Sequence, residues 1–233
     1  METITIHYLF TLPNGKQEVM EILLDAETLD LMNKIPESLP EWTMLDYHQC
    51  SNCLLALDTH KNCPIAVHFV KLLEIFESLL SFDTIHVDIF TAQRVTTMDT
   101  SAQKGASSLM GLIMATSGCP HMAFFKPMAR FHLPLSSAEE TVYRAASMYL
   151  LAQYFRKKEG LKIDLELNGL KELYRNIHII NKSMSGRLRD RYKKDVGPNS
   201  LTILDSFAQT LTMVIEEQLD ELRYLFRPYL LEP

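Results

Sequence analysis

The chain has 233 residues, of which 47% are hydrophobic, and its formal net charge at pH 7 is −6. This length and apolar content allow a full hydrophobic core, and the net negative charge disfavours nucleic acid as the main partner. No apolar run reaches the roughly 18 residues of a transmembrane helix, and the N-terminal residues do not have the pattern of a secretory signal. We therefore expect a cytoplasmic protein without a membrane partner.

The first hundred residues predict two antiparallel β-hairpins. Residues 4–10 show the two-residue alternation of a strand, Pro-Asn-Gly at 13–15 is typical of a turn, and the partner strand is expected at 18–24. A second pair of strands is expected at 84–90 and 94–98. These four short strands are expected to cover one face of a helical layer.

Three of the four cysteines lie within residues 47–66. Cys50 and Cys53 are separated by two residues, a spacing that lets two thiolates converge on one metal ion. Cys63 and Cys119 are each followed by proline, which is favoured at the first position of a helix. A cysteine at a helix N-terminus has a stabilised thiolate and a lowered pKa. The four cysteines together predict a metal centre.

The pattern leaves the nature of that centre open. Four thiolates are typical of structural zinc, which would fix the strand-rich part of the chain to the helices. The same distribution, with proline after two ligands, also fits a four-iron four-sulfur cluster in a redox or sensing protein. His48, His60 and His121 lie beside the cysteines and are alternative ligands or neighbours of the ligands. Redox-active thiols and simple core packing are the remaining interpretations.

The second half of the chain predicts helices. One is expected at 100–117, and another between 136 and 160 that begins at Ser136 or Ser137, each of which precedes a glutamate by three residues. The latter helix is apolar nearly all round, which predicts a central position. Two more helices are expected from about 165 to 189 and after 200. The chain thus reads as an α+β fold with two hairpins packed on a predominantly helical C-terminal half.

The composition does not shift sharply along the chain, and cysteines occur in both halves. We therefore expect one α+β domain over residues 1–233. Its strand-rich part, with the cysteine cluster, would be 1–99, and its helical bundle would be 100–233.

The segment 119–140 interrupts the helical pattern with three prolines, as positioned loops do. Lys126, Arg130 and His132 lie close together in it. As a site, the two cations would hold an anionic ligand and His132 would act as an acid or base. As structure, the cations would solvate a connection. A ligand-binding or enzymatic pocket in 119–140 is therefore the alternative function.

A basic run at 186–195 is interpreted as a solvated helix end or loop rather than a phosphate-binding patch. The chain has no glycine-rich nucleotide motif, no zinc-protease or helical di-iron motif, and no nucleophile elbow. An enzyme of a familiar motif class is disfavoured, and whether the chain is an enzyme at all is left open.

Three segments, 48–53, 62–66 and 111–155, resemble an uncharacterised bacterial protein family that is described as a domain of unknown function. The resemblance covers most of the chain. The resemblance implies a bacterial cytoplasmic protein and supports a common role for the four cysteines. It implies no activity. The family often has proline after the second cysteine of the pair, where this chain has Leu54.

The prediction is therefore a cytosolic metal-binding protein with a regulatory or binding role rather than a catalytic one. A partner protein or a homodimer is compatible with the sequence, which identifies neither.

Overall fold

A computed structural model describes residues 2–192 and 194–231. Four strands form one antiparallel sheet in the order β2-β1-β3-β4. The strands are β1 (Thr3–Thr11), β2 (Gln17–Asp25), β3 (Thr84–Phe90) and β4 (Val95–Ser101). Gly15 has a φ of 80° in the turn between β1 and β2, a conformation that glycine adopts without strain. The two predicted hairpins are therefore confirmed.

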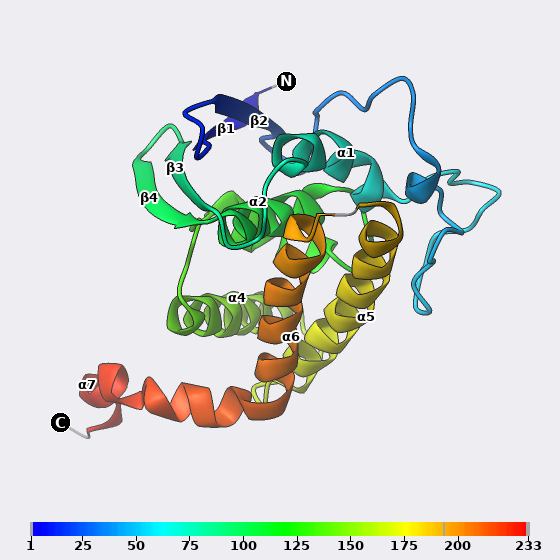
Figure 1. Ribbon diagram of the computed structural model, residues 1–233. Helices are drawn as coiled ribbons and strands as arrows, with labels where there is room; N and C mark the ends of the chain where they lie inside the picture. Colours follow the sequence, from blue (N-terminus) through cyan, green and yellow to red (C-terminus); the bar gives the residue numbers. More distant parts are fainter. Residues whose placement is uncertain (1, 193, 232–233) are drawn as a thin grey trace.

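Helices make up most of the rest of the chain (Figure 1). The α-helices are α1 (Pro64–Phe76), α2 (Ala102–Thr116), α3 (Lys126–Arg130), α4 (Ala138–Lys158), α5 (Asn168–Arg191), α6 (Val196–Glu221) and α7 (Arg227–Leu230). Short 3-10 helices are η1 (Glu41–Thr43), η2 (Ala123–Phe125) and η3 (Arg223–Phe226). The predicted α+β fold is confirmed. Among the described residues, no helix is both long and apolar enough to cross a membrane.

The sheet buries one face against α1 and α2. Strand residues alternate, so that Tyr8, Phe10 and Val87 are fully buried, whereas their neighbours on the strands, such as Leu9 and Asp88, are partly exposed. The Phe10 ring meets Phe76 of α1 edge to face, with ring centroids 5.0 Å apart. A Cβ atom at Gly105 of α2 would lie 2.9 Å from Ile85 Cδ1. The absence of a side chain there allows α2 to approach the sheet closely.

A long connection, residues 26–63, runs from β2 to α1 and is held by α5 (Figure 1). Arg187 of α5 is 1% exposed, and its guanidinium donates to the carbonyls of Trp42 (2.8 Å), Met44 (2.6 Å) and Leu45 (3.0 Å). Arg187 belongs to the basic run at 186–195, so the interpretation of that run as solvated is wrong for this residue. Its role is to satisfy buried backbone carbonyls, which would otherwise be costly.

The capping box predicted for the long central helix is present at α4. Ser137 Oγ accepts from the backbone N–H of Glu140 at 3.1 Å, and the Glu140 carboxylate accepts from the N–H of Ser137 at 2.7 Å. By contrast, Ser101 is the N-cap of α2 without a side-chain capping bond. The two serines therefore differ in what they contribute to their helices.

Replacing Ser137 with alanine is expected to lower the free energy of unfolding by about 1 kcal/mol, because the backbone N–H of Glu140 at the start of α4 loses its acceptor. Urea unfolding followed by circular dichroism measures the change. The matched variant Ser101→Ala removes an N-cap serine that makes no such bond, and its effect is expected to be much smaller. Equal losses in the two variants would contradict a stabilising role for the capping box.

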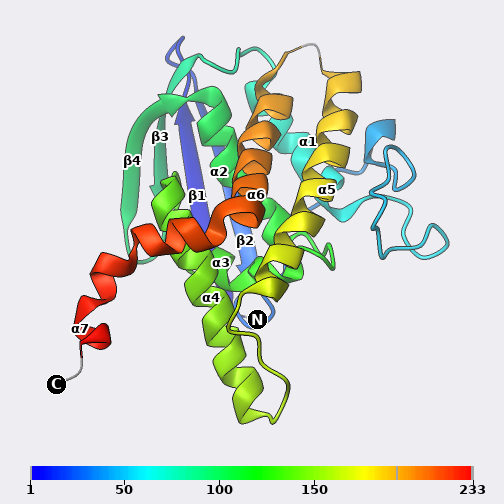
Figure 2. The ribbon, with the colours of Figure 1, turned by 90° about the horizontal axis from the view of Figure 1, so that it is seen from below.

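The prediction that α4 is central is wrong. Its side chains are apolar nearly all round, but Leu151 and Phe155 are more than half exposed, because α4 packs against its neighbours along one side only. Figure 2 shows α4 at one end of the layer, with α5 and α6 side by side next to it. From the same region the last turns of α6, followed by η3 and α7, extend away from the rest of the molecule.

Candidate functional site

The four cysteines do not form a metal centre. Within residues 2–192 and 194–231, no group of three or more His, Cys, Asp or Glu side chains is arranged to hold a metal ion. The predicted site at Cys50, Cys53, Cys63 and Cys119 is therefore wrong as a zinc centre, and equally wrong as an iron–sulfur centre. All four cysteines are free thiols.

Only one of the two proline-flanked cysteines begins a long helix. Cys63 is the N-cap of α1, with Pro64 directly after it, as predicted. Cys119, however, lies in the turn between α2 and η2. Burial raises the pKa of Cys50 and raises that of Cys119 to about 11, and the neighbouring Cys63 acts in the same direction on both. Protonated thiols at neutral pH are poor metal ligands.

The three histidines near the cysteines are each bonded elsewhere. His48 Nε2 lies 2.6 Å from Asp190 Oδ2, and His60 Nδ1 lies 2.9 Å from a threonine hydroxyl of the preceding residue. His121 Nε2 lies 2.6 Å from the carbonyl oxygen of Asn52. None of the three histidines belongs to a group of metal ligands among the described residues.

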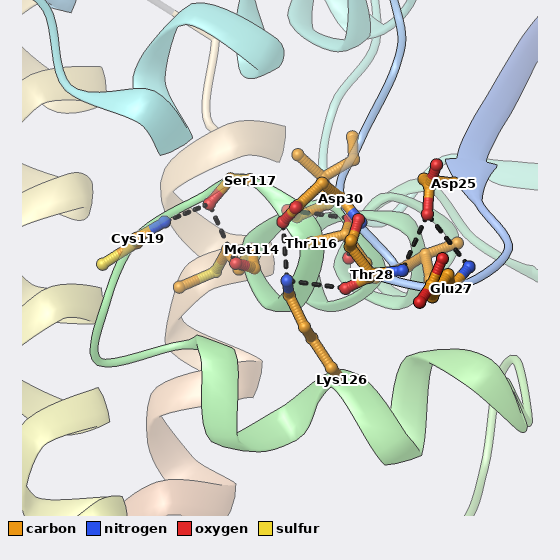
Figure 3. A network of polar contacts seen from close by, with 11 residues as sticks. Asp25, Glu27, Thr28, Asp30, Met114, Thr116, Ser117, Cys119 and Lys126 are labelled. Carbon is orange, nitrogen blue, oxygen red and sulfur yellow. Dashed lines mark hydrogen bonds and ion pairs between the residues drawn. The ribbon is translucent and has the colours of Figure 1, made fainter. Parts of the chain in front are cut away.

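Lys126 holds a turn rather than a ligand (Figure 3). Its Nζ donates to Asp30 Oδ1 at 2.6 Å and to the carbonyl of Thr28 at 2.8 Å. Figure 3 shows this contact beside the end of α2, with Cys119 pointing away from it. Arg130 is exposed and lies over the ring of Phe131, 5.5 Å from its centroid. Lys126 and Arg130 therefore do not share a cavity with His132.

His132 instead lines an open cavity of about 660 Å³ whose wall is formed by the end of β4, by α2, α3, α4, α5 and α6, and by the loop between α3 and α4. This volume is in the range of small-molecule sites. The wall is mainly apolar and rich in methionine and aromatic side chains, which include Met114, Met122, Phe125, Met128, Tyr174 and Phe207. The segment 119–140 thus contributes one side of the cavity, and helices far from it in sequence contribute the others.

A chain of hydrogen bonds connects the sheet to the cavity wall, in which Ser108 and His132 lie. Tyr8 Oη lies 2.5 Å from His132 Nε2 and 3.1 Å from Ser108 Oγ, and Ser108 Oγ also accepts from the backbone N–H of Leu135. Burial lowers the pKa of His132 to about 3, assisted by the nearby positive charge of Arg144, and burial raises the pKa of Tyr8. The imidazole is therefore neutral at ordinary pH and accepts a hydrogen bond from the Tyr8 hydroxyl at Nε2, which places its one N–H proton on Nδ1.

The cavity wall contains two basic residues, Arg144 and Lys104, and one acidic residue, Asp99. One of the terminal nitrogens of Arg144 donates to the carbonyls of Met128 (2.9 Å) and Phe131 (3.0 Å), which fixes the guanidinium at the wall. Within the described part of the chain, no carboxylate lies within ion-pair distance of it. Glu140, one turn earlier on α4, raises the pKa of Arg144, but its carboxylate is engaged in the capping box. Burial lowers the pKa of Arg144 and is the larger influence.

Sequence reasoning identified His132 but missed Tyr8, Ser108 and Arg144. The prolines of 119–140 marked the loop that carries His132, whereas nothing local marked the others. Tyr8 lies 124 residues from its histidine partner. In the sequence it was simply a strand residue with its side chain on the buried face.

A family model described as a domain of unknown function (DUF6901) matches residues 6–227, nearly the whole chain. No curated protein and no solved structure matches the chain. The evidence for function therefore comes from the cavity.

Proposed function

The chain belongs to the DUF6901 family, whose description assigns no activity, and we propose that it binds a small, mainly apolar molecule carrying a negatively charged group. The ligand occupies the cavity of about 660 Å³, and its charged group lies at Arg144. The apolar wall supplies most of the binding free energy through burial of the ligand surface.

The observation that carries this proposal is the unneutralised guanidinium of Arg144 in an apolar wall. A partly buried charge in an apolar wall is stabilised by a counter-charge, and the described residues offer Arg144 only the two carbonyls that orient it. A carboxylate, sulfonate or phosphate on a ligand would supply the missing partner. The methionine side chains around it are flexible and suit an apolar ligand of irregular shape.

Binding is favoured over catalysis because the pKa values of Tyr8 and His132 both lie far from neutral pH. An effective general base has a pKa near the working pH, whereas burial lowers that of His132 to about 3. Tyr8 is fully buried with a raised pKa, so it remains a neutral donor. Both groups can orient a ligand or its neighbours without exchanging protons.

Filling the cavity is expected to abolish binding. Gly111 of α2 lines it, and a Cβ atom there would meet only Leu204 Cδ2, at 3.6 Å, so a side chain can enter the free space. Gly111→Phe is expected to weaken binding of the fluorescent probe anilinonaphthalene sulfonate by roughly tenfold or more. Titration of the probe, with far-UV circular dichroism to establish folding, measures the effect.

The control is Lys71→Phe, which adds the same aromatic ring on the exposed surface of α1, away from the cavity. It is expected to bind the probe as the wild type does. A folded Gly111→Phe protein with unchanged affinity would refute the proposed function, and so would a wild-type protein without saturable binding.

A further inference from the structure

One buried side chain of the cavity wall has no hydrogen-bonding partner among the described residues. Asn181 of α5 is 1% exposed, and neither its amide nitrogen nor its amide oxygen makes a hydrogen bond with the described residues. A buried amide without partners is costly, and asparagine is also a weak helix former in the middle of a helix. A residue with these two disadvantages is explained if a ligand completes its hydrogen bonds.

The position of Asn181 directs it to the cavity. Tyr174, Ile177 and Asn181 follow the three- and four-residue spacing of one helical face, and all three line the cavity. The facing residues of α6 that line it, Leu204 and Phe207, are apolar and offer the amide no hydrogen bond. The unpartnered amide thus belongs to the part of the wall that α5 and α6 form.

Asn181 lies well away from the charged end of the cavity. Tyr174 is close enough to Arg144 to interact with it electrostatically, and it precedes Asn181 by seven residues. At a rise of 1.5 Å per residue, seven residues of α-helix span about 10 Å. Among the polar residues of the wall, Arg144 and Asn181 therefore mark two separate positions, a cation near Tyr174 and a donor–acceptor pair about two helical turns further along α5.

We infer that the ligand is an elongated apolar anion whose far end carries an amide or a group with the same adjacent donor and acceptor. This inference rests on the proposed function, because the anion at Arg144 fixes the direction in which the ligand lies. Asn181 Oδ1 accepts from the N–H of the ligand, and Asn181 Nδ2 donates to its carbonyl oxygen. Between the two ends, an apolar segment packs against Ile177 and the methionine side chains of the wall.

Two probes of equal chain length test the assignment. Decanoate carries only the anion, whereas the monoamide of decanedioic acid carries the same anion and a terminal amide. Both are measured by displacement of anilinonaphthalene sulfonate from the full chain. The wild type is expected to bind the monoamide at least about tenfold more tightly, because the methyl end of decanoate leaves the amide of Asn181 unpaired.

Asn181→Leu is similar in size and removes the donor and the acceptor together. It is expected to lose or reverse the preference for the monoamide, while decanoate binds as well as before or better. Its melting temperature without ligand is expected to equal or exceed that of the wild type, because an unsatisfied buried amide has been removed. A purely structural asparagine would instead lower the melting temperature and leave the preference unchanged.

Arg144→Gln separates the role of Asn181 from the proposed function. It is expected to weaken both probes by a similar factor and to leave their ratio as in the wild type. If the wild type binds both probes equally and Asn181→Leu changes nothing, the role of Asn181 is refuted and the proposed function stands. If the wild type binds neither probe, both are refuted.

Discussion

Replacing Arg187 with methionine is expected to lower the free energy of unfolding by about 3–5 kcal/mol, a large fraction of the stability of a typical domain. The guanidinium donates three hydrogen bonds to backbone carbonyls of residues 42–45, and methionine can make none of them. Each buried carbonyl left without a partner costs about 1–3 kcal/mol. The Nε atom of Arg187 is itself unpartnered among the described residues, so relief of the buried charge offsets part of the loss.

Urea unfolding followed by tryptophan fluorescence measures this change directly, because the single tryptophan, Trp42, lies in the segment that Arg187 holds. Arg189→Met is the matched control, since Arg189 is exposed two residues further along the same basic run. Its effect is expected to be within about 0.5 kcal/mol of zero. A similar loss in both variants would mean that the basic run acts through its overall charge and not through the bonds of Arg187.

Acidification from pH 7.5 to pH 5 is expected to lower the stability of the protein by about 2 kcal/mol through His132 alone. The pKa of His132 is about 3 in the folded protein, against 6.5 for an ordinary histidine. Between these two pH values His132 is protonated in the unfolded chain but not in the folded protein. The free energy of unfolding therefore rises with pH. The contribution is fully present above pH 6.5 and is lost progressively as the pH falls towards 3.

His132→Gln removes this titration while keeping an acceptor that Tyr8 can reach, so the variant separates His132 from the carboxylates that also titrate in acid. The free energy of unfolding is measured by urea denaturation at half-unit intervals of pH. The difference between wild type and variant is expected to shrink or change sign as the pH falls. A difference that stays constant from pH 7.5 to pH 5 would show that His132 can be protonated in the folded state at little cost.

The strands could be predicted because one face of the sheet is buried. Val87 and Ile89 alternate with His86 and Asp88, and this pattern records directly which side chains face the core. The prediction for α4 failed for a related reason. When a helix has apolar residues on every side, its sequence does not show which side is buried. The sequence therefore could not distinguish a central helix from one at the end of a layer.

The candidate site was only partly predictable from the sequence. The helix-starting role of Cys63 followed from the proline after it, but the expected lowering of thiol pKa values at the cysteines did not, since burial of Cys50 and Cys119 acts in the opposite direction. The proline-rich loop carries His132, which lines the cavity, but the predicted grouping of His132 with Lys126 and Arg130 is absent from that wall among the described residues. Asn181 was invisible, because an asparagine within a helix is ordinary until its surroundings show that it is both buried and, among the described residues, unpartnered.

The hydrogen bonds of Arg187 also determine the order in which parts of the protein can fold during synthesis. Its three bonds join residues that are 142 to 145 positions apart in the chain. During synthesis, the hairpins and α1 leave the ribosome long before α5 exists, so the connection of residues 26–63 emerges without its anchor. Such distant contacts also slow folding, because much of the chain must be organised before they can form. The connection of residues 26–63 can therefore form its hydrogen bonds to Arg187 only after α5 has been synthesised. Truncated or stalled chains that lack α5 are expected to have a folded first hairpin and a connection without these bonds.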